Sequence, residues 1–191
     1  MGQTANWDLV YPASTDDVRV YEDIQALADS AETAMDTLQG QVPTLLKRGS
    51  RASNGTTTTT GEQEYLRLDS IPIVSGRAYR IWTTPLIFNS SVAGDLVQVY
   101  LRANTAGVAT TGSTQLTLLA DDAKTSGLAQ KTKGLEFLYV ASTTGNLSLL
   151  LSYLRATGSG NVNIQASSDI PCQLNVDAYN GAAPSNTGVS L

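Results

Sequence analysis

Apolar and polar residues alternate with a period of two from Glu64 onward, as in β-strands that have one buried and one exposed face. The alternation is clear where Val97, Val99 and Leu101 take every second position, and it recurs in Leu174, Val176 and Ala178. Strands are predicted over residues 65–71, 78–83, 96–103, 114–119, 135–141, 146–154, 161–166 and 172–179. Turn residues separate them, so we expect an antiparallel β-sandwich or jelly roll.

The strand predicted over residues 146–154 is apolar on both faces. One face holds Leu147, Leu149, Leu151 and Tyr153, and the other holds Leu150 and Leu154. Two arrangements explain this pattern. Either the strand is central and a loop covers its second face, or the second face meets a neighbouring subunit.

A helical period replaces the alternation near the N-terminus. Apolar residues recur at spacings of four, three, four, three and four, at Val20, Ile24, Leu27, Ala31, Ala34 and Leu38. This spacing predicts an amphipathic helix with a coiled-coil seam of roughly three heptads. Gly40 and Pro43 are expected to end the helix, and Ser14 with Asp17 carries the signature of a helix start.

The width of this seam suits three helices around an axis better than two, because Tyr21, Ala28 and Met35 flank it. We therefore expect a short trimeric coiled coil with a thin middle at Ala31 and Ala34. The other interpretation is an amphipathic helix lying on its own β domain, since periods of 3.5 and 3.6 barely separate over about 20 residues.

The segment before the helix is unusually apolar for a chain terminus. Trp7, Leu9, Val10 and Tyr11 precede Pro12. Such a segment requires a covering surface, so we expect these four residues to form an arm that docks on a larger assembly. The arm and helix are predicted to occupy residues 1–46.

Residues 47–63 are predicted to be a linker between the helix and a sandwich over residues 64–191. Lys47, Arg48 and Arg51 gather positive charge there, and a run of threonines follows at 56–60. This run fits an edge strand and a solvated connector equally well.

The composition argues against nucleic acid and membranes as partners. Charged residues make up 15% of the chain and the net charge is −5, which leaves no basic surface for nucleic acid. The sequence has no signal-peptide pattern and no apolar run of the roughly 20 residues that cross a bilayer. We expect no membrane insertion and synthesis in a host cytoplasm.

The chain offers little for catalysis. It contains no histidine and a single cysteine, Cys172, so Ser-His-Asp and Cys-His mechanisms and a tetrahedral zinc site are not available within one chain. Asp121 and Asp122 are expected in a solvated turn, and Gly158 to Gly160 in a hairpin turn. We expect no enzyme activity, no metal and no cofactor, and Cys172 as a small buried apolar residue.

Several motifs resemble a known family. The N-terminal motifs are Asn6-Trp7, Tyr11-Pro12, Ser14-Thr15-Asp16 and Ala26-Leu27-Ala28. The later ones are Val74-Ser75-Gly76-Arg77-Ala78-Tyr79-Arg80-Ile81, the turn Ala93-Gly94-Asp95 before a strand that ends in Leu101-Arg102, and Leu154-Arg155-Ala156-Thr157-Gly158-Ser159-Gly160-Asn161. Together they are similar to tailed-phage virion proteins of actinobacterial phages, known as minor tail, head-fibre or capsid decoration proteins.

The resemblance implies a homotrimer on the virion surface. The arm and helices would dock on the major capsid protein or on tail proteins, and the β-sandwiches would face outward. No catalytic residues come with it. The alternative is a glycan- or host-receptor-binding adhesin module, which the uncharged polar surface and tyrosines such as Tyr100 and Tyr179 would suit, with a host surface glycan as partner.

Overall fold

The computed structural model describes residues 2–3, 10–11, 20–122, 124–125 and 131–179. The chain divides into two compact units, Met1–Val42 and Pro43–Leu191. The sequence placed the end of the first unit at residue 46, so the division lies four residues earlier than expected.

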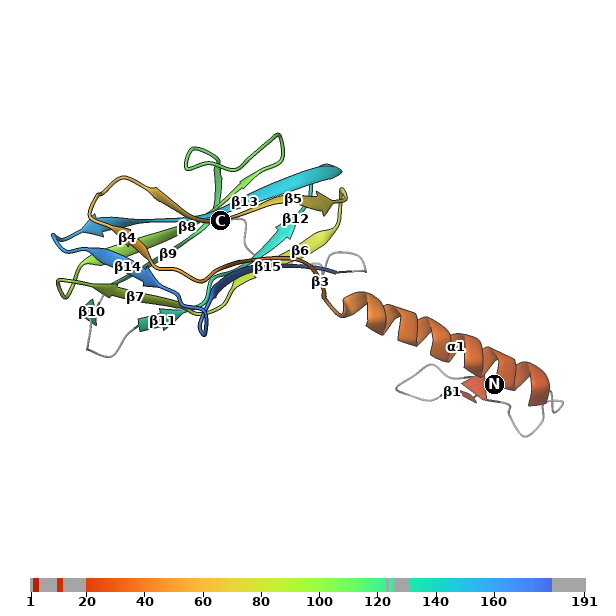
Figure 1. The fold of residues 1–191 in the computed structure, drawn as a ribbon. Coiled ribbons are helices and arrows are strands. Elements are labelled where there is room, and N and C mark those ends of the chain that lie inside the picture. Colours follow the sequence, from red (N-terminus) through yellow and green to blue (C-terminus); the bar gives the residue numbers. More distant parts are fainter. Residues whose placement is uncertain (1, 4–9, 12–19, 123, 126–130, 180–191) are drawn as a thin grey trace. The chain divides into compact units, whose positions relative to one another are not determined.

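The N-terminal unit contains the predicted helix. Strand β1 (Gly2–Gln3) pairs antiparallel with β2 (Val10–Tyr11), and α1 (Val20–Gln41) follows (Figure 1). Glu22 and Asp23 lie in the first turn, where carboxylates interact favourably with the positive end of the helix dipole. The helix ends at Gln41, before Pro43, and Gly40 lies within its last turn instead of ending it.

The C-terminal unit is built from three sheets that are antiparallel except for one short pair. The β13 sheet has the order β5 (Gln63–Ile73), β13 (Gly145–Thr157), β8 (Leu96–Asn104) and β9 (Thr114–Asp122). The β15 sheet has the order β12 (Glu136–Val140), β6 (Ala78–Thr83), β15 (Cys172–Ala178) and β3 (Thr44–Arg51). The β7 sheet has the order β10 (Lys124–Thr125), β7 (Leu86–Ser90), β14 (Val162–Gln165) and β4 (Gly55–Thr57), and β11 (Lys131–Lys133) also pairs with β7. Among the described strands, β10 and β7 are the one parallel pair.

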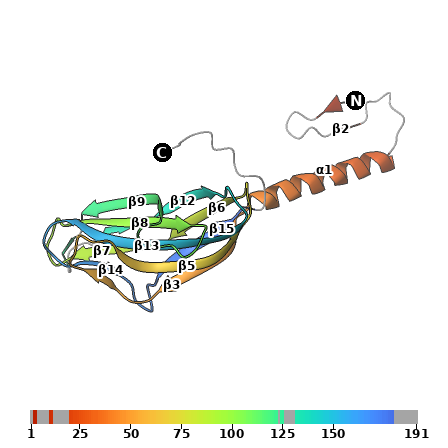
Figure 2. The ribbon, with the colours of Figure 1, turned by 90° about the horizontal axis from the view of Figure 1, so that it is seen from above.

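The three sheets enclose one hydrophobic core. In Figure 1 the β13 sheet forms one layer, and the β15 and β7 sheets follow one another along the opposite layer; Figure 2 shows the β13 sheet from above. Val99, Leu101, Ile81, Val176 and Ile164 are all 0% exposed and belong to the same core cluster. The prediction of a mainly β, antiparallel architecture is confirmed, and each of the predicted strands has a counterpart in the structure.

The prediction of a linker over residues 47–63 is wrong in part, because β3 extends into it as far as Arg51 and β4 lies within it. Of the two interpretations of the threonine run, the edge strand holds for Thr56 and Thr57. Strand β3 pairs with β15, and Thr56 and Thr57 of β4 form the edge of the β7 sheet beside β14. The prediction failed here because two cations of β3, Lys47 and Arg51, are partly buried and bond to backbone carbonyls. Lys47 donates to the carbonyl oxygens of Asp69 and Ser70, and Arg51 Nη1 donates to the carbonyl of Tyr65 at 2.6 Å.

The glycine-rich turn 158–160 is not a hairpin. It carries the chain from β13 to β14, which belong to different sheets. Gly158 has a φ of +101°, a conformation that glycine adopts without steric cost, and Gly160 donates its N–H to the buried carboxylate of Asp95 at 2.9 Å. A Cβ at position 160 would lie 2.5 Å from that carboxylate, so the crossing requires glycine.

Candidate functional site

Helix α1 presents a continuous apolar stripe. Ile24, Leu27, Met35 and Leu38 are 61%, 51%, 57% and 62% exposed, and Ala31 and Ala34 are exposed between them. Val20 begins the helix, and its side chain lies outside the described residues. Burying a large apolar side chain of this kind contributes about 1.5–3 kcal/mol. The stripe is therefore the strongest candidate for self-association in the N-terminal unit.

Only part of the apolar arm lies within the described residues. Val10 and Tyr11 form β2, which pairs with Gln3 and Gly2, while their side chains lie outside the described residues. Trp7 and Leu9 also lie outside the described residues. The role predicted for the four residues as a docking arm stays a prediction.

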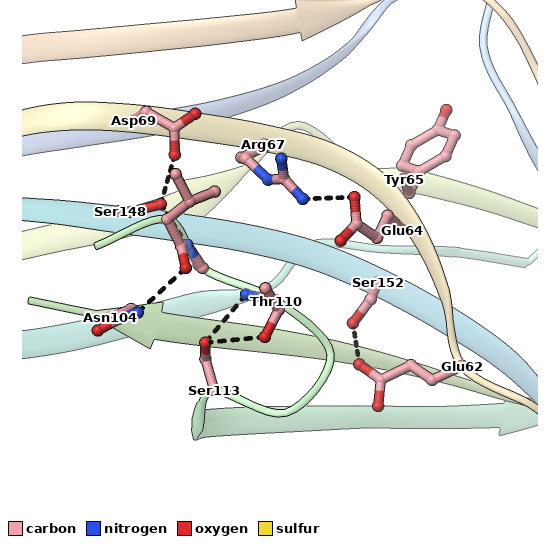
Figure 3. A network of polar contacts seen from close by, with 12 residues as sticks. Glu62, Glu64, Tyr65, Arg67, Asp69, Asn104, Thr110, Ser113, Ser148 and Ser152 are labelled. Carbon is pink, nitrogen blue, oxygen red and sulfur yellow. Dashed lines mark hydrogen bonds and ion pairs between the residues drawn. The ribbon is translucent and has the colours of Figure 1, made fainter. Parts of the chain in front are cut away.

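The loop between β8 and β9, residues 105–113, lies across the outer face of β13, the face that points away from the core. Ala109 is 0% exposed and donates its N–H to Ser148 Oγ at 2.8 Å, while Ser148 Oγ donates to Asp69. Asn104 Nδ2 holds the loop by donating to the carbonyl of Val108 at 3.0 Å (Figure 3). Leu150 on this face is 0% exposed. Strand β13 is thus a central strand with a loop over its back, the first of the two arrangements considered above.

A nearly buried ion pair between Arg102 and Glu62 lies at the other end of this outer face. Arg102 contacts both carboxylate oxygens of Glu62, with Nε to Oε1 at 2.6 Å and Nη2 to Oε2 at 2.5 Å. The side chains of Arg102 and Glu62 are 15% and 13% exposed. Ser152 Oγ also donates to Glu62, and Arg102 Nη1 donates to the carbonyl of Ser113 at 2.9 Å. The hydrogen bond to Glu62 raises the pKa of Arg102, so the guanidinium keeps its charge.

Tyr100, a candidate for stacking on sugar rings, is already engaged within the protein. The guanidinium of Arg102 lies 5.0 Å from its ring centroid, and its hydroxyl donates to Gln98 Oε1 at 2.7 Å. Tyr100 therefore serves the packing of the outer face of the sheet. Tyr179, the other candidate, is half-buried and directly follows β15.

The outer face of the β15 sheet is less exposed to solvent than predicted. The alternation along β15 placed Asn175 and Asp177 on a wet face, yet they are 0% and 8% exposed. Trp82 Nε1 donates to Asp177 Oδ2 at 2.7 Å, and Arg48 Nε donates to Asn175 Oδ1 at 2.7 Å. Long side chains from the neighbouring strands β6 and β3 therefore cover both residues, which the pattern of β15 alone does not reveal.

No catalytic constellation forms among the described residues. Ser148 and Asp69 are hydrogen-bonded, but Ser148 is 4% exposed and also accepts the N–H of Ala109, so it serves to fasten the loop. No group of three or more histidine, cysteine, aspartate or glutamate side chains in this part of the chain could hold a metal. Asp121, expected in a solvated turn, instead lies in β9 and pairs with Lys133 at 2.9 Å.

Two cavities lie beside the 105–113 loop. The first, of about 400 Å³, is lined by Ala103, Asn104, Thr105, Gly112, Ser113, Thr114, Leu116, Tyr139 and Ser142. The second, of about 390 Å³, is lined by Asp69, Ser70, Thr105, Ala106, Gly107, Val108, Asn146, Leu147 and Ser148. Neither was predicted, because their lining residues come from strands and loops far apart in the sequence.

Cys172 is buried as predicted, at 3% exposure, and burial raises the pKa of its thiol to about 12. We expect the native thiol to react with a maleimide at neutral pH about a thousandfold more slowly than the unfolded chain, because the thiolate is the nucleophile. Labelling followed by mass spectrometry, with and without denaturant, measures both rates. Equal rates in the two states would contradict the prediction.

In the described part of the chain, no helix has the length and apolar character needed to span a membrane. The exposed apolar residues of α1 lie along one side of the helix and do not surround it. This distribution fits contact with another protein surface along one side of the helix.

No protein-family model and no curated protein matches the sequence. Among solved structures, the CBM22-1 xylan-binding domain from Paenibacillus barcinonensis Xyn10C is 12% identical, with 75% of this chain and 92% of that one covered and a TM-score of 0.36. Eiger TNF from S. frugiperda is 10% identical over 77% and 98%, with a TM-score of 0.41. The infectious bursal disease virus VP2 subviral particle is 11% identical over 73% of this chain and 38% of that one, with a TM-score of 0.36. At TM-scores this low the similarities carry no argument about function, and the assignment of the chain as a mainly β, antiparallel protein rests on its own strand pairing.

Proposed function

We propose that this protein is a non-enzymatic structural component of a tailed bacteriophage virion. It assembles as a homotrimer through α1, docks on the capsid or tail through its N-terminal unit, and displays outward its C-terminal unit, Pro43–Leu191, here called the β unit. The observation that carries the proposal is the exposed stripe of Ile24, Leu27, Met35 and Leu38 along one helix.

The stripe requires a partner because most of the stability of a helix in a protein comes from packing its apolar face against another surface. Helix α1 has 22 residues, and its large apolar side chains at positions 24, 27, 35 and 38 are each more than half exposed. Two further copies of the same stripe are the occupants that its spacing of three and four residues fits, because such a seam is complementary to itself.

The flanking position of Met35 favours three helices over two. Met35 is 57% exposed and lies one position from Ala34, so the apolar surface is wider than a two-stranded seam. The small side chains of Ala31 and Ala34 bury little area in the middle of the seam. We expect a compact trimer and not a long rigid stalk.

The β unit supports the structural role because its strands form a core of their own. Leu149, Leu151 and Val176 are 0% exposed within it, and the outer face of β13 is covered by the unit's own loop. These features are those of a displayed module. The resemblance of the N-terminal motifs to phage virion proteins supports an arm that faces the particle.

Light scattering on the full chain tests the assembly. A mass of three times 20.1 kDa at micromolar concentration is expected. A monomeric mass across this range would remove the main support for the proposal. Immunogold labelling of particles then distinguishes capsid from tail, and the absence of label on any particle would contradict the virion assignment.

A further inference from the structure

We propose that the cavity between the edges of β9 and β12 binds one unit of a neutral saccharide. The cavity lies wholly within the β unit, at the junction of the two sandwich layers. Thr114 and Leu116 reach it from β9, Tyr139 from β12, and Thr105 and Ser142 from adjoining loops. The proposal goes beyond the structural role, since it assigns a ligand to the displayed module.

The two long sides of the sandwich are closed differently. On one side Lys47 and Arg51 of β3 donate hydrogen bonds to backbone carbonyls of β5 and so link the layers. On the other side β9 and β12 are the edge strands of their sheets, and Leu116 and Tyr139 remain only partly buried against the core. The cavity of about 400 Å³ occupies this open side.

Four hydroxyl groups line the cavity and are accessible to a ligand. They belong to Thr105, Thr114, Tyr139 and Ser142. Within the described ranges, none of these hydroxyls has a hydrogen-bond partner. Each can both donate and accept, which is the pattern that the hydroxyls of a sugar ring require. The side chains of Asn104 and Ser113, by contrast, are engaged in holding the 105–113 loop.

The lack of charged residues in the lining indicates which class of ligand the cavity binds. None of the residues that line the cavity is charged, so neither an anion nor a cation finds a counter-ion there. Burial raises the pKa of Tyr139, which keeps its phenol neutral and able to donate. A neutral ligand is therefore favoured over a phosphate, a carboxylate or an amine.

Tyr139 and Leu116 supply the apolar contact that a sugar ring also needs. Their side chains are half-buried and, with Ala103, form the apolar part of the lining. An apolar partner would take these hydroxyls out of water and leave them unpaired, which opposes binding. A polyhydroxyl ring satisfies them and packs its C–H groups on the aromatic ring.

The test uses saturation-transfer difference NMR on the full chain. The probes are linear trisaccharides of glucose, galactose, mannose and xylose at millimolar concentration, with trigalacturonic acid as the charged comparison. We expect saturation transfer to at least one neutral trisaccharide and none to the acidic one. Saturation transfer to none of the neutral probes, or stronger binding of the acidic one, overturns the proposal.

Variants locate the binding. Tyr139→Phe removes only the hydroxyl and is expected to weaken binding about two- to tenfold, while Tyr139→Ala abolishes it. Tyr100→Phe is the matched control, because Tyr100 lies on the outer face of the β13 sheet and bonds Gln98. Equal binding in Tyr139→Ala and the unmodified chain overturns the proposal.

Two further variants keep the result interpretable if Tyr139→Ala does not fold or if the trimer does not form. If Tyr139→Ala does not fold, Thr114→Val, which removes another lining hydroxyl at nearly constant shape, is expected to weaken binding to a similar degree as Tyr139→Phe. Substitution of Ile24 and Leu27 by aspartate changes only α1 and is expected to leave saccharide binding intact. Failure of the trimer and failure of the saccharide site are thus distinguishable.

Discussion

The double substitution Ile24→Asp and Leu27→Asp is expected to convert the proposed trimer into monomers. Ile24 and Leu27 are 61% and 51% exposed on α1, and in the trimer they would lie at the seam. Removing two apolar seam residues from each chain forfeits about 1.5–3 kcal/mol per residue, and the new carboxylates would face one another around the axis. Light scattering at micromolar concentration should therefore report a mass of 20.1 kDa.

The matched control places the same charges on the opposite side of the helix. Ala26→Asp and Thr33→Asp lie outside the seam and its flank, and both side chains are exposed. This variant is expected to remain trimeric. A double Ile24 and Leu27 variant that keeps the trimeric mass would mean that the β units, and not α1, hold the copies together.

Arg102→Met is expected to destabilise the β unit by about 3–5 kcal/mol, the largest single-residue effect outside the apolar core. The substitution removes the guanidinium that neutralises Glu62, a side chain only 13% exposed, and leaves the hydroxyl of Ser152 as its donor. Urea denaturation at neutral pH measures the free energy of unfolding. The measurement belongs in the monomeric α1 variant, because the apparent stability of a trimer depends on its concentration.

Arg67→Met is the control for this loss. Arg67 pairs with Glu64 at 2.5 Å on the same outer face, but the two side chains are 33% and 48% exposed (Figure 3). Solvent screens such a pair, so its removal is expected to cost about 0–1 kcal/mol. Replacing Glu62 by leucine in the Arg102→Met background should recover most of the stability, because no uncompensated charge then remains. Equal losses for Arg102→Met and Arg67→Met would show that the burial of the first pair does not matter.

Local periodicity is the part of this structure that the sequence predicts well. The alternation of Val97, Val99 and Leu101 reports which face of β8 meets the core, because successive side chains of a strand point to opposite faces. The spacing of Ile24, Leu27 and Leu38 in the same way reports one side of α1. Both signals lie within a single element and need no knowledge of its neighbours.

Strand β3 shows where local periodicity fails. Lys47, Arg48 and Arg51 place charge on both faces of the strand, so its sequence has no buried side to recognise. Lys47 and Arg51 are satisfied by carbonyl groups of β5, which lie 14 to 23 residues away in the sequence. Strand β7 was also missed, although the apolar run Leu86-Ile87-Phe88 after Pro85 is a signal that could have found it.

The sequence by itself determined the mainly β class, the helix and its apolar stripe, and the absence of histidine chemistry. Only the tertiary structure decided what covers each outer face, as when Trp82 shields Asp177 and the 105–113 loop lies over Ser148. It also decided the pairing of Glu62 with Arg102 and the meeting of Thr114 with Tyr139 at one cavity. The physical reason is that a strand's own pattern records only its two faces, whereas the groups that meet those faces come from distant segments that the fold brings together.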